Sequence, residues 1–228
     1  MDTNMNKILE KIAYCIKIGK INKSSPHPPD MKGQDGTDEL TLKAIELGIS
    51  PNEILAKGLI VGMQRVGEKF RNNEIFLPDV LMAARSMTAG MEHLSPYFMS
   101  GDVKYKGKIV IGTVSGDLHD IGKKIVGMFF KGGGWDVIDL GVDVPAEKFI
   151  NAIKEHKPHA TGLSALLTTT MINMEKITKQ IKATHPEVKI IIGGAPVTKE
   201  FADKIGANAY FPDPQGALNF LNAACSQD

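Results

Sequence analysis

The sequence Lys108-Ile109-Val110-Ile111-Gly112-Thr113-Val114 is followed directly by Ser115-Gly116-Asp117-Leu118-His119-Asp120-Ile121-Gly122. The first part is an apolar run with the length and β-branched composition of a buried strand, and the second is a polar loop that leads into a helix. A strand, a loop and a helix in this order begin a β–α unit. The loop also exposes a histidine two residues after an aspartate, and Gly122 would let a large group approach the backbone.

The same alternation of strand and helix patterns continues to the end of the chain. Candidate strands cover Ile109 to Val114, Trp135 to Leu140, Ala160 to Leu163, Lys189 to Ile192 and Ala209 to Phe211. Candidate helices cover Ile121 to Lys131, Ala146 to His156, Met171 to Thr184, Lys199 to Ile205 and Gln215 to Ala224. This pattern predicts an α/β, Rossmann-like (flavodoxin-like) parallel sheet of five strands with helices on both faces.

The chain before this sheet has helical periodicity instead. Candidate helices cover Asn4 to Ile18, Thr37 to Leu47, Ser50 to Phe70 and Phe76 to Leu94, with Pro96 as the expected stop of the last one. Gly58 and Gly62 would let a neighbouring helix come close, and the segment 21–36, rich in proline and glycine, is predicted to be an exposed, mobile loop. We therefore expect a four-helix bundle acting as a cap domain over residues 1–99, a linker over 100–107 and the α/β domain over 108–228.

Composition limits the classes of function. The 228 residues carry 27 basic and 26 acidic side chains, a formal net charge of +1, which gives no reason to expect nucleic acid or an anionic membrane as partner. No apolar run approaches the roughly 20 residues that span a bilayer, and the polar N-terminus does not resemble a signal peptide, so we expect a cytoplasmic protein. Cys15 and Cys225 lie too far apart in the sequence for a close-spaced zinc site or redox pair, and both are predicted to be buried.

Polar and small residues follow the predicted strands at the edge where such sheets bind ligands. In a doubly wound sheet, ligands bind outside the carboxyl ends of the strands, where the strand order reverses. With the order 2-1-3-4-5, the loops after the first and third strands face one another. The sequence therefore predicts one crevice lined by these loops and by Gly193-Gly194 after the fourth strand.

Three kinds of ligand could use this crevice. A flavin phosphate would need a loop rich in Ser, Thr and Gly after the first strand, which instead carries Asp117, His119 and Asp120. A phospho-acceptor receiver domain would need a lysine after the fifth strand, where Phe211-Pro212-Asp213 has none. Asp117 and His119 are too few for zinc, which takes three or four protein ligands. A metal held in a macrocycle needs only a single further ligand from the protein.

Three motifs in order carry a family resemblance. Asp117-x-His119-x-x-Gly122, then Ser164-x-Leu166, then Gly193-Gly194 resemble the cobalamin-binding signature of methionine synthase, corrinoid mutases and the methanol and methylamine corrinoid proteins. Because helices with Val66-Gly67-Glu68-Lys69-Phe70 and Phe76-Leu77-Pro78 precede them, the chain most resembles the corrinoid carrier proteins of methyltransferase systems. The resemblance covers roughly residues 37 to 225, and the long join between the first two helices departs from the short acidic turn usual in the family.

The resemblance implies a cofactor, cobalamin, bound with its own base displaced from cobalt (base-off) and His119 as the metal ligand (His-on). Asp117 would hydrogen-bond to the other imidazole nitrogen, and Thr170 would complete this relay at a position where methionine synthase has serine. The nucleotide tail would lie between the third and fourth strands. The implied cofactor contacts are Gly116, Asp117, Leu118, His119, Asp120, Ile121, Gly122, Ser164, Leu166, Thr168, Gly193, Gly194 and Tyr210, with Met82 and Met87 as candidates on the upper face.

The implied function is methyl transport, with cobalt cycling between Co(I) and methyl-Co(III). The expected partners are a substrate-specific methyltransferase, a second methyltransferase that delivers the methyl group to tetrahydrofolate or to a thiol such as coenzyme M, and a reductive activator. Two alternatives are a cobalamin-binding subunit of an adenosylcobalamin mutase and a cobalamin-sensing regulator. The helical cap favours a methyl cofactor over the first, and the absence of a DNA-binding module argues against the second. The sequence does not distinguish methanol, methylamines, glycine betaine and aromatic methyl ethers as donors.

Overall fold

The computed structural model describes residues 2–225, and the side chains of residues 5–224. The chain divides into two compact units: a helical unit, which runs to Tyr105 and includes Gly132–Gly134, and an α/β unit formed by the residues from Lys106 to Lys131 and from Trp135 onward. Each unit is described by itself. Among the described residues, no helix is both long and apolar enough to cross a membrane.

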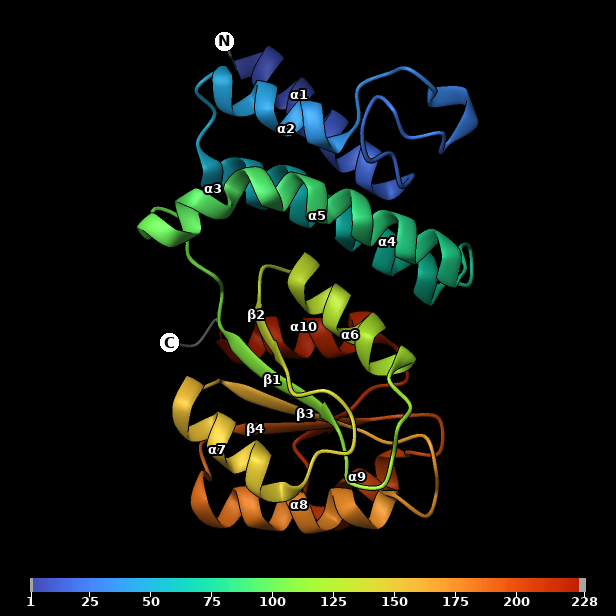
Figure 1. Cartoon of the computed structure of the whole chain (residues 1–228), viewed down its shortest axis with the longest axis vertical. Helices are drawn as coiled ribbons and strands as arrows, with labels where there is room; N and C mark the ends of the chain where they lie inside the picture. Colours follow the sequence, from blue (N-terminus) through green and yellow to red (C-terminus); the bar gives the residue numbers. More distant parts are fainter. Residues whose placement is uncertain (1, 226–228) are drawn as a thin grey trace. The chain divides into compact units, whose positions relative to one another are not determined.

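The α/β unit contains one parallel sheet of five strands in the order β2-β1-β3-β4-β5 (Figure 1). The strands are β1 (Lys108–Thr113), β2 (Asp136–Asp139), β3 (Ala160–Ser164), β4 (Lys189–Gly193) and β5 (Ala209–Tyr210). The predicted sheet and strand order are confirmed. The predicted strand boundaries agree to within one residue at each end because each apolar run is bounded by turn-forming residues.

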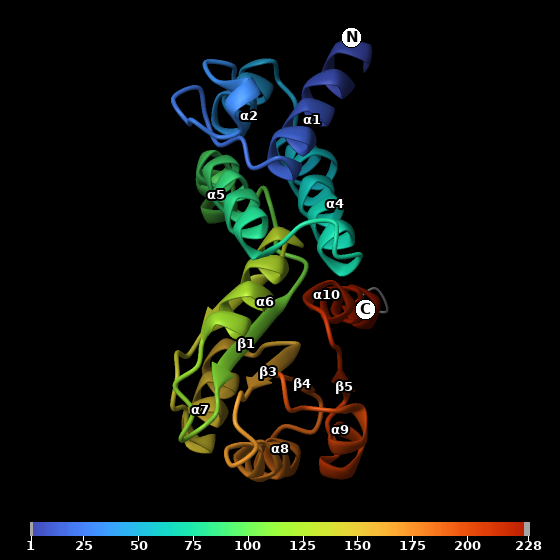
Figure 2. The same ribbon diagram turned by 90° about the vertical axis from the view of Figure 1, so that its right-hand side faces the viewer.

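Helices cover both faces of this sheet (Figures 1 and 2). One face packs against α7 (Ala146–His156), α8 (Met171–Thr184) and α9 (Lys199–Ile205) through a core that includes Phe149, Ile177 and Ile190. The other packs against α6 (Ile121–Gly132) and α10 (Pro214–Cys225) through a core that includes Phe130, Trp135 and Leu218. Because both faces are buried, β1 and β4 contain the continuous apolar runs 109–111 and 190–192.

The register of the central strands brings their carboxyl ends together. Thr113 of β1 is paired with Ser164 of β3, and Ser164 is paired with Gly193 of β4. The Val114 N–H donates to the Ser164 carbonyl at 3.0 Å, and the Ala165 N–H donates to the Gly193 carbonyl at 3.2 Å. The loops after these strands therefore start side by side, as the predicted crevice requires.

The helical unit contains α1 (Asp2–Lys17), the short 3-10 turn η1 (Pro29–Met31), α2 (Thr37–Glu46), one continuous run formed by α3 (Pro51–Glu53), the π-helical η2 (Ile54–Leu59) and α4 (Ile60–Arg71), and α5 (Leu77–Ser100). Ser50 caps the continuous run, since its hydroxyl accepts the Glu53 N–H at 3.2 Å. A Cβ on Gly62 would lie 2.7 Å from the Ile16 Cβ, so the close approach of α1 that the glycine spacing predicts is confirmed.

Two expectations for this unit are wrong. Pro96 lies inside α5, which continues to Ser100 and ends at Gly101 in the left-handed conformation. Pro96 is exposed, and the backbone group that loses its hydrogen bond to a proline can be solvated there. The segment 21–36 is not exposed throughout: Ser25 is buried at 8% exposure, and its carbonyl accepts the amine of the fully buried Lys20 at 3.1 Å.

Of the two cysteines predicted to be buried, Cys15 has a described side chain and Cys225 does not. Cys15 is buried at 2% exposure, as predicted, and burial raises the pKa of its thiol to about 11. The side chain of Cys225 lies outside the described residues.

Candidate functional site

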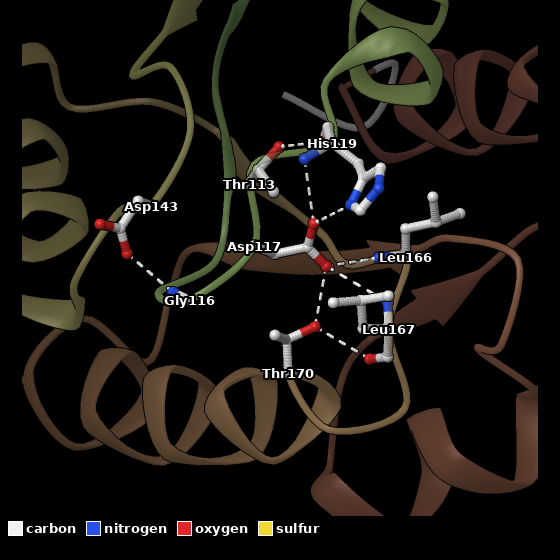
Figure 3. Close-up of polar contacts among 8 residues, drawn as sticks. All are labelled: Thr113, Gly116, Asp117, His119, Asp143, Leu166, Leu167 and Thr170. Atoms are coloured by element: carbon white, nitrogen blue, oxygen red, sulfur yellow. Dashed lines mark hydrogen bonds and ion pairs between the residues drawn. The ribbon is translucent and has the colours of Figure 1, made fainter.

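Asp117 is the centre of the polar network at the carboxyl edge of the sheet (Figure 3). Its carboxylate is fully buried. Oδ1 accepts the backbone N–H of His119 at 3.0 Å and lies 2.8 Å from the ring Nδ1 of the same residue. Oδ2 accepts the backbone N–H of Leu166 at 2.7 Å, that of Leu167 at 3.2 Å and the Thr170 hydroxyl at 2.8 Å. Asp117 therefore joins the loop after β1 to the loop after β3.

These hydrogen bonds keep the carboxylate ionised. Burial by itself raises the pKa of Asp117, but the N–H groups of His119 and Leu166, the Thr170 hydroxyl and the His119 ring outweigh it and hold the pKa well below its usual range. A buried carboxylate that is still charged is a strong hydrogen-bond acceptor.

The ionised carboxylate fixes the tautomer of His119. Because Asp117 can only accept, Nδ1 of the neutral ring carries the proton, and Nε2 keeps its lone pair. The side chain of His119 is half-exposed at 52%, whereas the carboxylate behind it is at 0%. The Thr113 hydroxyl holds the next part of the loop by donating to the His119 carbonyl at 2.9 Å. An imidazole in this state can coordinate a metal through Nε2, with its orientation set by the carboxylate.

The glycines at this edge show where a bulky group fits. A Cβ on Gly193 or on Gly122 would meet no protein atom within 4 Å, so both glycines border open space. A Cβ on Gly194, by contrast, would lie 1.7 Å from the Ala165 carbonyl oxygen. Around His119, the side chains of Leu118, Ile121 and Leu166 are exposed at 71%, 66% and 43%. An exposed imidazole surrounded by apolar side chains and glycine-lined space fits a large, mostly apolar metal macrocycle.

Four other predicted contact residues form no hydrogen bond to the side chain of Asp117 or His119 among those described. Asp120 forms an ion pair with Lys124 at 2.5 Å. Thr168 is exposed in the loop after β3, and Ser164 ends that strand half-buried. Tyr210 is partly buried against the core that includes Phe149, so an interior role is as well supported as a tail contact.

Met82 and Met87 belong to the helical unit, where Met87 is buried at 4% exposure and Met82 is half-buried. Their assignment to the upper face stays a prediction.

Two polar side chains that the sequence analysis did not assign hold the loop before His119. Asp143, in the loop after β2, accepts the Gly116 N–H at 2.7 Å (Figure 3). The Asn173 side chain on α8 donates to the Ser115 carbonyl at 2.7 Å. Asp143 follows Gly141 and precedes Pro145 at the sheet edge, which is a weak signal for a loop contact. Asn173 gave no signal, because it reads as an ordinary helix position.

Comparison with known proteins agrees with this geometry. Residues 107–217 match a B12 binding domain, and residues 34–95 match a second family model, also described as a B12 binding domain. The trimethylamine corrinoid protein of Methanosarcina barkeri is 42% identical over 191 residues, which cover 82% of this chain and 88% of the relative. This chain belongs to the corrinoid proteins of methyltransferase systems. Dimethylamine corrinoid protein 1 of Methanosarcina acetivorans is 46% identical over 173 residues, which cover 75% of this chain and 81% of the relative.

Solved structures extend the likeness of this corrinoid protein to both units. The methanol:cobalamin methyltransferase complex MtaBC of Methanosarcina barkeri contains a chain with a TM-score of 0.80 and 30% identity, covering 97% of this chain and 81% of that one. A cobalamin-binding protein from Desulfitobacterium hafniense matches with a TM-score of 0.74 and 28% identity, covering 95% and 98%. Cobalamin is the cofactor of this corrinoid protein, as the sequence motifs indicated.

Replacing Thr170 by alanine is expected to lower the free energy of unfolding of the apoprotein by roughly 1–3 kcal/mol. The change removes one of the three donors to Oδ2 of the buried Asp117 carboxylate. Thr170→Ser keeps the hydroxyl and should remain close to wild type. Urea unfolding of the three proteins measures the effect, and equal destabilisation by serine and alanine would mean that the threonine methyl group, not the hydroxyl, matters.

Proposed function

We propose that this corrinoid protein binds cobalamin base-off, with His119 Nε2 as the lower cobalt ligand, and carries a methyl group between two methyltransferases. The observation that supports this most is the Asp117–His119 pair. A buried, ionised carboxylate holds Nδ1 at 2.8 Å and directs a half-exposed ring with a free Nε2 lone pair out of the protein.

When bound, cobalamin supplies the cobalt centre that accepts a methyl group and gives it up again. The chain's own residues orient and tune that centre. Asp117 would hold the imidazole in the orientation that cobalt ligation needs, and Thr170 holds Asp117 through its hydroxyl. Gly193 and Gly122 leave space for the bulky parts of the cofactor.

The methyl donor we propose is a methylated amine. Relatives named trimethylamine and dimethylamine corrinoid proteins are 41% to 46% identical to this chain, whereas the chain in the methanol methyltransferase complex is 30% identical. The first partner would be an amine-specific methyltransferase. The second would pass the methyl group to a thiol such as coenzyme M or to tetrahydrofolate, and a reductive activator would restore the reduced cobalt.

Transfer from a radiolabelled amine tests this proposal. The full chain is reconstituted with hydroxocobalamin, reduced, and mixed with a trimethylamine-specific methyltransferase and trimethylamine labelled in its methyl groups. Label should appear on the chain only when both the methyltransferase and cobalamin are present, and His119→Ala should reduce the labelling rate. Labelling by a methanol-specific enzyme with methanol, and not by enzymes specific for methylated amines, would contradict the assignment of the donor.

A further inference from the structure

The loop between β2 and α7, residues 140–145, contacts the turn that leads to His119. That turn runs from Val114 to Asp117 and is closed by the Asp117 N–H, which donates to the Val114 carbonyl at 3.1 Å. Gly116 occupies its third position with a φ of +82°, a conformation that suits glycine. The Gly116 N–H takes no part in closing the turn, so it can donate to a group outside the turn.

Asp143 supplies that acceptor and makes a second contact. Its Oδ1 accepts the Gly116 N–H at 2.7 Å, and its own N–H donates to the Asp117 carbonyl at 3.0 Å. The backbone of Asp117 is therefore held through its N–H by Val114 and through its carbonyl by Asp143. The side chain of Asp117 is held from the opposite direction, by the N–H groups after β3 and by Thr170.

The loop that carries Asp143 is itself fixed to the sheet. The Thr113 N–H donates to the Gly141 carbonyl at 3.0 Å, and the Val144 N–H donates to the Thr113 carbonyl at 2.9 Å. The Gly141 N–H donates to Asp139 Oδ1 at 2.9 Å, and the buried amine of Lys123 pairs with the same oxygen. Asp143 thus contacts the turn from a supported position.

The conformation of Asp143 is unusual for a residue with a side chain. Its φ is +52°, in a region that glycine and asparagine adopt most readily. Asp143 is also exposed, so its side chain adds little to the core. Among the described hydrogen bonds, the side chain of Asp143 makes the one to Gly116, which directly precedes Asp117.

We propose that Asp143 is a positioning residue for the cobalt ligand His119. By fixing Gly116 and the Asp117 backbone, it keeps the carboxylate where it can orient the imidazole before the metal binds. This inference rests on the proposed function of His119. It extends that function to a residue outside the cobalamin motifs, one that reaches neither the imidazole nor the Asp117 carboxylate.

Two substitutions separate the hydrogen bond from charge and backbone strain. Asp143→Asn keeps a side-chain oxygen that can accept the Gly116 N–H and tolerates a positive φ, but removes the charge. Asp143→Gly removes the acceptor and relaxes the backbone, so a folding defect is not expected. Lys157→Gly is the matched control, because Lys157 also has a positive φ, of +48°, and lies at the end of α7 in the same unit.

Two measurements on the full chain test the inference. Hydrogen exchange of residues 114–119 in the apoprotein reports the order of the turn without cofactor. Electron paramagnetic resonance of the cobalamin-loaded Co(II) protein, grown with ¹⁵N-histidine so that a histidine nitrogen splits the signal into a doublet, reports the fraction of cobalt with a histidine nitrogen. For Asp143→Gly we expect roughly tenfold faster exchange and a roughly tenfold larger fraction of cobalt without that nitrogen, the size of effect that the loss of one hydrogen bond allows. Asp143→Asn and Lys157→Gly should match wild type.

These measurements separate a failure of the role proposed for Asp143 from a failure of the proposed function. If wild type shows the histidine nitrogen and Asp143→Gly shows it equally, the inference is overturned and the proposed function stands, even if exchange is faster. An equal loss in Lys157→Gly would overturn it too, because the effect would then follow from backbone relaxation anywhere in the unit. If wild type shows no histidine nitrogen, the proposed function fails and the inference fails with it.

Discussion

His119→Ala should still bind cobalamin, but with an altered absorption spectrum at neutral pH and a less negative Co(II)/Co(I) potential. The loop should stay folded because Asp117 keeps the N–H of residue 119, the N–H groups of Leu166 and Leu167, and the Thr170 hydroxyl. A nitrogen ligand favours the more oxidised metal, so its removal makes reduction easier. A tenfold preference would correspond to a shift of ~59 mV for a one-electron couple.

Spectroelectrochemical titration of the reconstituted variant measures this shift. His185→Ala is the control, since His185 lies in the same unit at the end of α8 and its Nδ1 contacts only the neighbouring Thr184 hydroxyl among the hydrogen bonds described. A spectrum and a potential equal to those of wild type in His119→Ala would show that another group binds the cobalt.

Gly193→Val should lower the affinity for cobalamin at least roughly a hundredfold, while the apoprotein keeps its fold. Gly193 ends β4 beside Ser164, and a Cβ there meets no protein atom within 4 Å, so this position borders open space. The new methyl groups would instead fill space that we assign to the nucleotide tail. A ligand that must displace or avoid a buried side chain loses several kcal/mol of affinity, and each ~1.4 kcal/mol is tenfold.

The neighbouring glycine provides the opposite case. A Cβ on Gly194 would lie 1.7 Å from the Ala165 oxygen, and its φ is +139°, so Gly194→Ala should destabilise the apoprotein by roughly 3 kcal/mol or more. Thermal unfolding and equilibrium binding of hydroxocobalamin, measured on both variants, separate the two effects. Wild-type affinity in a folded Gly193→Val protein would place the tail elsewhere.

The parts of this fold that depend on periodicity could be predicted from the sequence. Strands such as Lys108–Thr113 are apolar runs between turn residues, and α7 and α8 begin and end at the predicted residues. Periodicity could not show that α5 passes through Pro96, because an exposed helix tolerates one lost hydrogen bond when solvent replaces it. It also could not show that Ser25 is buried in a segment rich in proline.

The candidate site was predictable only where side chains recur in a known motif. Asp117 and His119 stand two residues apart and could be read together, and Thr170 followed from the family resemblance. Leu166 and Leu167 hold the carboxylate through their backbone N–H groups, which nearly every residue type has, so the sequence does not reveal these contacts. Asp143 and Asn173 are separated from the atoms they bind by 27 and 58 positions, and the folded topology is what brings them together.

The nitrogen bound to cobalt in the Co(II) protein is the most direct test of the account. We would grow the chain with ¹⁵N-histidine, load it with unlabelled cobalamin, reduce it to Co(II) and record the electron paramagnetic resonance spectrum. If His119 is the lower ligand, the nitrogen splitting seen with unlabelled protein, a triplet, becomes a doublet, and in His119→Ala this histidine splitting disappears. A triplet that persists in the labelled protein would mean that the cofactor's own base stays on the metal, and it would contradict the base-off, His-on assignment.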